Sequence, residues 1–305
     1  MTAVRRLLGG LAVVWGAVTL TFLALHLTPG STVDAIVGQS VVTPEVRAQI
    51  VAEYGLDQPL WIQYLSYLGR LVRGDLGHSY GQGTQVAEAI GEQFGSTLLL
   101  VAVGLGLAFG GAVLVAAATA HRSRWWRGSA VGAERVSVAV PPFWLGILLL
   151  VAFSFSLRWF PAIGSDSPRG LVLPAVALAV APAAMLSQVM RHALEKTLEE
   201  PFVTSARARG LTRTAVLARH AVRHALLPVV TLAGWLVAAF IGGAIVTETV
   251  FARQGLGRLT VTAIEGKDFP LVSGLVLVSA VAYVVVGIGV DALYGVLDPR
   301  LRAST

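Results

Sequence analysis

Six long apolar runs without an acidic or basic residue constrain this chain more than any other feature. A helix needs roughly 20 apolar residues to cross the hydrocarbon core of a bilayer, and each run is about that long. Charged residues make up 13% of the sequence, whereas soluble domains carry about 25%. The pattern predicts an all-α integral membrane protein with six transmembrane helices. The runs are residues 7–27, 98–120, 136–157, 171–190, 225–247 and 271–290.

The first run follows Arg5 and Arg6 and has the outline of a secretory signal peptide. Its apolar stretch is longer than the roughly 7–15 residues of such signals, and it lacks a small-x-small cleavage site. We therefore expect residues 1–28 to be a tail and a retained first span.

Basic residues are distributed unevenly among the connections between the runs. Of the 23 Lys and Arg residues, eight lie in the connections after the first, third and fifth runs, and the other fifteen lie elsewhere in much less sequence. The positive-inside rule then places both termini and the connections after the second and fourth runs in the cytoplasm. The net charge of +6 therefore serves membrane topology, and no nucleic-acid partner is expected.

Residues 29–97 form a long connection that the same rule places outside. Thr43, Pro44 and Glu45 have the pattern of a helix start, which predicts a helix to about residue 54. A second, amphipathic helix is expected over residues 60–71, and glycine turns over 74–77 and 81–83. We expect a small helical cap on the outer surface. Its second helix places Trp61, Tyr64, Leu65 and Leu68 on one side.

The most basic segment, residues 199–228, lies between the fourth and fifth runs. It predicts a short helix over 202–210, ended by Gly210, and a second helix over about 212–225. An ordinary basic cytoplasmic loop explains the charges equally well. However, small side chains at Ala206 and Ala208 let another backbone approach closely, as when a helix docks into a groove. The segment is interpreted as a cytoplasmic coupling loop, residues 195–226.

This segment resembles the EAA loop of the permease subunits of bacterial ATP-binding-cassette importers, in particular the dipeptide, oligopeptide and nickel branch. The resemblance covers almost the whole chain as an ordered set of short motifs, each weak alone. Contiguous motifs occupy residues 29–30, 55–60, 63–64, 74–77, 97–98, 142–143, 173–174, 255–257 and 298–300. Further matching residues are Ser79, Pro161, Gly164, Glu248, Phe251, Asp268, Pro270, Asp291 and Tyr294.

In that family the loop docks into a groove on a separate ATP-hydrolysing subunit. The resemblance implies contact candidates in the first loop helix, with two neighbours at the interface. The contact candidates are Thr204, Ser205, Ala206 and Gly210, and the neighbours are Phe202 and Arg207. The sequence departs from the family pattern in two places. Thr204 replaces the acidic residue that gives the loop its name, and Ser31 replaces an Asp that is frequent in this branch.

The chain shows no motif for nucleotide or metal chemistry. Its two lysines, Lys196 and Lys267, lack the glycines of a phosphate-binding loop. We therefore expect no enzyme activity in this chain, and ATP and Mg on the partner ATPase subunits. His220 and His224 have the spacing of two zinc ligands but no third ligand, and cysteine is absent. No metal site and no cofactor is expected here.

The interiors of the six runs contain no Asp, Glu, Lys or Arg. Ion-coupled carriers usually keep such groups near the membrane midplane, so this absence argues against ion coupling. Most small polar side chains in the runs are expected to pack between helices, and a minority to line a path. Pro141 and Pro142 are expected to kink or start a span. The candidates for a translocation path or gate are Ser187, Gln188, Thr231 and Glu248.

Together these features predict a permease subunit of an ATP-driven importer in the bacterial inner membrane, with residues 98–305 as its five-span core. The resemblance implies a second homologous permease subunit, two ATPase subunits and an extracytoplasmic solute-binding protein as partners. The expected cargo is a dipeptide or oligopeptide, and nickel, glutathione or haem stay open. An ion-coupled secondary carrier is a remoter alternative. An intramembrane hydrolase lacks its catalytic constellation, such as Gly-x-Ser-x-Gly.

Overall fold

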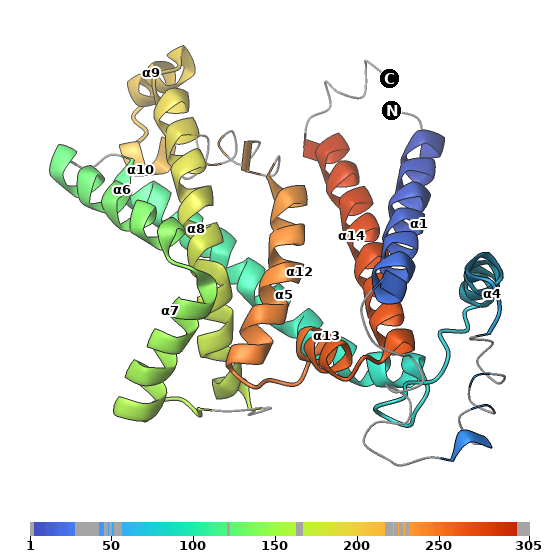
Figure 1. Ribbon diagram of the computed structural model, residues 1–305. Helices are drawn as coiled ribbons and strands as arrows, with labels where there is room; N and C mark the ends of the chain where they lie inside the picture. The colour runs from blue at the N-terminus through green and yellow to red at the C-terminus, as the bar shows by residue number, and fades with distance from the viewer. Residues whose placement is uncertain are drawn as a thin grey trace. The chain divides into compact units, whose positions relative to one another are not determined.

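The structure, a computed structural model, consists of helices joined by turns (Figure 1). The part of the chain that it describes contains no β-strand, only one antiparallel bridge between His78 and Gln85. The predicted all-α fold is confirmed. The described residues are 3–27, 43–45, 48, 51, 57–120, 123–162, 167–216, 222, 225, 228–229 and 232–297.

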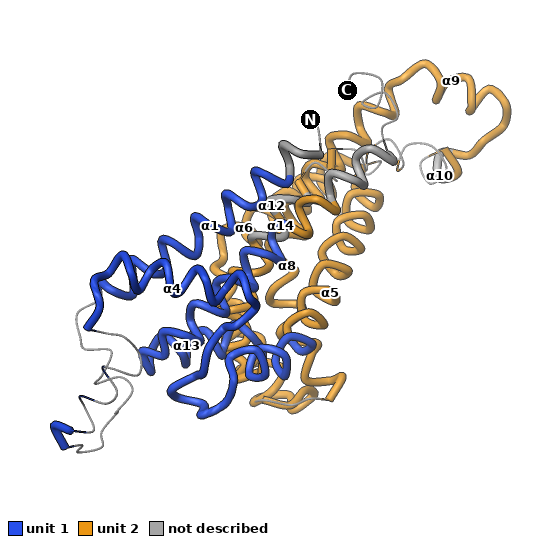
Figure 2. The backbone as a smooth tube through the Cα atoms, turned by 90° about the vertical axis from the view of Figure 1, so that its right-hand side faces the viewer, with its two compact units in different colours: residues 1–96, 255–284 blue, residues 97–254, 285–305 orange. Residues whose placement is uncertain are grey.

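The helices form two compact units, which Figure 2 distinguishes by colour. Unit 1 comprises residues 1–96 and 255–284, and unit 2 comprises residues 97–254 and 285–305. The division of the sequence at residues 28 and 97 stays a prediction.

Unit 1 has a buried apolar core that includes Val86, Leu259, Leu271 and Leu275. A glycine allows the close packing within it, because a Cβ atom at Gly274 would lie only 2.5 Å from Cγ1 of Val86. The helices of this unit are α1 (Ala3–Leu27), α4 (Leu60–Val72), α13 (Leu256–Glu265) and the first parts of α5 (Val86–Thr119) and α14 (Phe269–Leu297).

Helix α4 confirms the second helix predicted for the outer loop. It packs on α1 through Tyr64 and Tyr67, whose rings lie 5.2 and 5.8 Å from that of Phe22. His26 at the end of α1 is satisfied by the carbonyl of Phe22 and by the side chain of Gln63. Trp61, on the predicted apolar side of α4, is 65% exposed, so that side is only partly covered. The predicted helix over 43–54 lies largely outside the described residues.

The predicted glycine turns after α4 are confirmed. Gly74, Gly77 and Gly83 all have positive φ angles, between 68° and 81°, where glycine is favoured. The buried carboxylate of Asp268 holds this region to the start of α14. It accepts hydrogen bonds from Oγ of Ser79 (2.5 Å) and from the backbone N–H groups of Gly81 and Leu271.

Unit 2 contains the other described helices, among them those of the coupling segment. Its described helices are the second part of α5, α6 (Arg124–Ala139), α7 (Pro142–Leu149), the π-helical η1 (Leu150–Ser156), α8 (Pro168–Leu198), α9 (Pro201–Ala208), α10 (Arg213–Val216), α12 (Ala233–Val250) and the last part of α14.

The predicted effect of Pro141 and Pro142 is confirmed, because the third run is bent at this pair and Pro142 starts a helix. Residues 136–157 do not form a single straight helix, because α6 and the α7–η1 segment meet at an angle of 103°. A proline disfavours the helical conformation of the residue before it. Val140 and Pro141, each followed by a proline, are both extended, with ψ angles of 122° and 136°. Pro142 then begins α7.

Four described helices are long and apolar enough to cross a membrane, and a fifth span results if the bent pair counts as one. The four are Leu7–Leu27, Val86–Thr119, Pro168–Leu198 and Phe269–Gly289, which correspond to the first, second, fourth and sixth predicted runs. The fifth run corresponds to α12, but much of its beginning lies outside the described residues. The count of six spans therefore stays a prediction.

Leu178 of α8 lies between two glycines of neighbouring helices in unit 2. A Cβ atom at Gly243 of α12 would lie 2.6 Å from its Cδ1 atom, and one at Gly104 of α5 would lie 3.3 Å from its Cδ2 atom. Leu178 is buried, so its side chain is confined on both sides. These two glycines let α5 and α12 approach α8 closely.

We expect Gly243→Val to lower the melting temperature of the purified protein, because overpacking a well-packed core costs about 1–3 kcal/mol. Gly242→Val is the matched control, since nothing lies within 4 Å of a Cβ atom at that position. Thermal unfolding of both variants checks the prediction. Equal melting temperatures for the two would contradict the close packing around Leu178.

Candidate coupling site

The predicted short helix in the basic segment is present as α9, which follows the end of α8 (Figure 1). Pro201 occupies its first turn, where a missing N–H group costs nothing. Gly210 ends it with a φ angle of +89°. The N–H groups of Gly210 and Leu211 bond back to the carbonyls of Arg207 and Ala206, at 2.9 and 3.3 Å. A left-handed glycine after the last turn is a common helix end.

Helix α9 buries one side chain fully and leaves most of its surface exposed. Val203 is buried, whereas Ala206 is half-buried. The other sequence candidates, Phe202, Thr204, Ser205, Arg207 and Gly210, are exposed. The open surface is available to a partner, and the role of these six residues in contacting an ATPase stays a prediction.

The second predicted loop helix is described only in part. Helix α10 begins after Thr212, whose hydroxyl accepts a hydrogen bond from the N–H of Ala215. Residues 217–221, 223 and 224 lie outside the described residues, and with them His220 and His224.

A cavity of about 260 Å³ lies behind the coupling segment. Its wall is mixed in charge, and Arg127 of α6 and Glu195 of α8 form an ion pair there, 2.9 Å apart. The lining residues belong to α6, α8, α9 and α10 or directly follow the ends of α5 and α8, so the cavity marks where these elements meet. They are Ala120, Arg127, Glu195, Leu198, Glu199, Val203, Arg207 and Val216.

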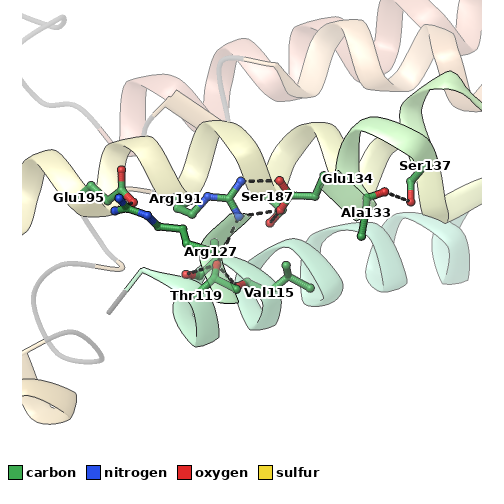
Figure 3. Close-up of polar contacts among 10 residues, drawn as sticks. Val115, Thr119, Arg127, Ala133, Glu134, Ser137, Ser187, Arg191 and Glu195 are labelled. Atoms are coloured by element: carbon green, nitrogen blue, oxygen red, sulfur yellow. Dashed lines mark hydrogen bonds and ion pairs between the residues drawn. The ribbon is translucent and has the colours of Figure 1, made fainter. Parts of the chain in front are cut away.

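A second ion pair, between Glu134 of α6 and Arg191 of α8, lies nearby and is buried (Figure 3). Each of the two side chains is only about 5% exposed. Arg191 binds the carboxylate with both terminal nitrogens: Nη1 donates to Oε1 at 2.8 Å, and Nη2 donates to Oε2. Ser187 also donates to Oε1, at 2.7 Å. Nη1 of Arg191 further reaches the hydroxyl of Thr119 at the end of α5, at 3.3 Å.

The two ion pairs fix the register of α6 on α8. Ser187, Arg191 and Glu195 are four residues apart and therefore lie along one face of α8. Glu134 meets the beginning of this stripe and Arg127 its end, so α6 and α8 run antiparallel. The signs alternate on both helices, and a shift by one turn would place like charges together.

Two described helices extend past the uncharged runs and carry an ionisable group there. Arg191 lies within α8 and Glu248 lies within α12, each just beyond the end of an uncharged run. The apolar runs were defined by the absence of charged residues, so every run ends before the nearest charge. For this reason these runs gave no indication of the Glu134–Arg191 pair. The spacing of Ser187, Arg191 and Glu195 was the one available signal.

The four candidates for a path or gate lie in different environments. Ser187 is buried on Glu134, and Gln188 is half-buried. Glu248 is fully buried, and its Oε1 atom accepts a hydrogen bond from Thr97 at 2.6 Å. Thr231 lies outside the described residues. The assignment of these four residues to a path or gate stays a prediction.

Comparison with known sequences identifies the family. The profile of the binding-protein-dependent transport system inner membrane component matches residues 104–303, and the profile of its N-terminal part matches residues 2–101. The chain belongs to this family. It is a permease subunit of an ATP-binding-cassette importer of the peptide and nickel group, a multi-pass protein of the inner membrane, as the sequence motifs implied. Permease subunits of this family are not themselves enzymes.

Relatives of this permease match over nearly its whole length. A protein of Brucella suis biovar 1, provisionally named a peptide permease protein, is 36% identical over 313 residues, which cover 98% of each chain. The glutathione transport system permease protein of Salmonella choleraesuis is 34% identical over 98% of this permease and 97% of its own length. The protein of that name from Escherichia coli O6:H1 is 34% identical over 98% of each chain.

In the permease, Gly210→Ala should open the coupling segment locally. The left-handed conformation costs about 1–2 kcal/mol for a residue with a Cβ atom, which corresponds to a factor of about 5–30 in the open population. Trypsin should therefore cleave after Arg209 faster by about that factor. Gly128→Ala in the exposed part of α6 is the control and should leave cleavage after Arg209 unchanged. Equal rates would show that the φ angle of Gly210 does not hold α9.

Proposed function

We propose that this permease forms, with a second homologous permease subunit, the translocation path for dipeptides or oligopeptides across the inner membrane. The relative named as a peptide permease protein, 36% identical along the whole chain, supports this cargo. Glutathione is the second candidate, because several relatives carry the name of a glutathione transport system permease protein. Nickel and haem are the remaining candidates, from the resemblance of the motifs to the wider group. An ion-coupled secondary carrier is disfavoured by the family.

The exposed helix α9 is the observation that carries the mechanism. It is short, it is anchored mainly by Val203, and it ends at a conformationally fixed glycine. We propose that it docks into a groove on an ATPase subunit through Thr204, Ser205, Ala206 and Gly210, with Phe202 and Arg207 beside them. Closure of the ATPases then displaces α9, and α9 displaces the helices behind it. Such a displacement switches the spans between two states of access.

The proposed assembly has two permease subunits, two ATPase subunits and an extracytoplasmic solute-binding protein. The ATPases bind ATP and Mg, because the lysines of the permease lack the glycines of a phosphate-binding loop. The positive-inside rule supports cytoplasmic termini and a cytoplasmic α9. The outer loop with α4 then faces the binding protein.

We expect Ser205→Trp to abolish solute uptake and to prevent co-purification of the ATPase, because an indole on the exposed side of α9 blocks its entry into a groove. Membrane insertion should be unchanged. The control is Ser129→Trp, on the exposed face of α6. Uptake assays and subunit analysis of the purified complex check both variants. Normal uptake by Ser205→Trp would place the ATPase contact elsewhere.

The cargo can be determined on the native complex. Mass spectrometry of the purified assembly with its binding protein should find a dipeptide or oligopeptide, and unlabelled peptide should compete with uptake of a labelled one. Bound glutathione without peptide would favour the second candidate. Uptake that persists without any ATPase and collapses with an ionophore would overturn the importer mechanism.

A further inference from the structure

We propose that Glu134 and Arg191 are positioning residues for the coupling step. They lock α6 to the last turns of α8, so that the two helices move as one rigid lever when α9 is displaced. This inference rests on the proposed function, because it assumes that α9 receives the force. The two-helix lever is defined as α6 together with residues 187–198 of α8.

The Glu134–Arg191 pair is built to select one geometry. Removing two charges from water is costly, and apolar side chains of similar size often stabilise a protein equally well. Such a pair is therefore better suited to specifying a geometry than to adding stability. Both carboxylate oxygens are engaged, and Ser187 supplies a third hydrogen bond to them. If α6 slid by one turn, about 5.4 Å, both charges would stay buried without their partners.

Helix α8 alone is a weak transmitter of force. Pro174 and Pro182 lie inside it, and each proline removes a backbone hydrogen bond from the helix ladder. Helix α6 contains no proline. The buried pair therefore gives the force received at the end of α8 a second path, through α6 and the bend at Pro141 into α7.

Helix α6 is connected through α7 to the C-terminal end of α12. It turns at Pro141 into α7, and Gly146 of α7 lies against the end of α12. A Cβ atom at Gly146 would be 3.1 Å from Cε2 of Phe251 and 3.3 Å from Cγ1 of Val250. The buried Glu248 lies one turn earlier on α12 and binds Thr97 of α5. A movement of α6 thus reaches the buried carboxylate at this end of unit 2.

The first test measures whether the two helices move together. The chain contains no cysteine, so spin labels can be attached at Ser129→Cys on α6 and at Lys196→Cys, an exposed position within the α8 part of the lever. In the full complex in lipid nanodiscs, the distance between these labels should be the same without nucleotide and with trapped ATP. In the presence of Glu134→Gln the ATP-bound distribution should broaden or shift. A distance that changes between the two states without Glu134→Gln would overturn the rigid lever.

The second test separates coupling from folding. Glu134→Gln and Arg191→Gln should lower the solute taken up per ATP hydrolysed by about 5- to 150-fold, the usual range of an allosteric coupling. The exchange Glu134→Arg with Arg191→Glu should recover part of it. Arg135→Gln, an exposed neighbour on α6, is the control and should leave this ratio unchanged.

The outcomes distinguish the inference from the function on which it rests. If uptake and hydrolysis fall in parallel with the melting temperature, and the ratio stays constant, the pair is only structural and the inference fails. If the unmodified complex contains no ATPase or takes up no solute, the proposed function fails instead.

Discussion

Charge buried among apolar helices is the constraint on which unit 2 depends. Glu134 and Arg191 cannot be hydrated where they lie, so each needs the other in a fixed geometry. Their pairing determines how α6 lies along α8, and the exposed pair between Arg127 and Glu195 extends the same register toward α9. The coupling segment is therefore held on two helices that share one set of charges.

The same requirement recurs at the other buried carboxylates among the described residues. Glu248 is satisfied by Thr97, and Asp268 is satisfied by Ser79, although the partners are 151 and 189 residues apart in the sequence. All four residues belong to the short motifs by which the chain resembles peptide-importer permeases. Motifs that are far apart in the sequence are thus joined by hydrogen bonds between their side chains. Each bond connects two distant segments of one unit.

Local patterns predicted the elements whose causes are local. The proline and glycine around α9, the amphipathic pattern of α4 and the glycine turns after it all act within a few residues, and the structure contains each of them. Pro141 and Pro142 likewise predicted a kink or the start of a span, but the 103° angle between α6 and the α7–η1 segment could not be predicted from them. A hydropathy pattern gives the length of an apolar segment. The direction of its backbone depends on the prolines within it.

The sequence alone determined the membrane class, the family motifs and the helix that a partner can reach, because hydropathy, charge distribution and helix ends are properties of neighbouring residues. Only the tertiary structure decided which charges are buried and what satisfies them. In the sequence Arg191 is a basic residue at the end of an apolar run, and it is buried only in the fold, where it contacts Glu134 of α6 and Thr119 of α5. Glu134 is 57 residues away from Arg191 in the sequence. The packing of α6 on α8 brings the two together, and no local sequence pattern encodes that packing.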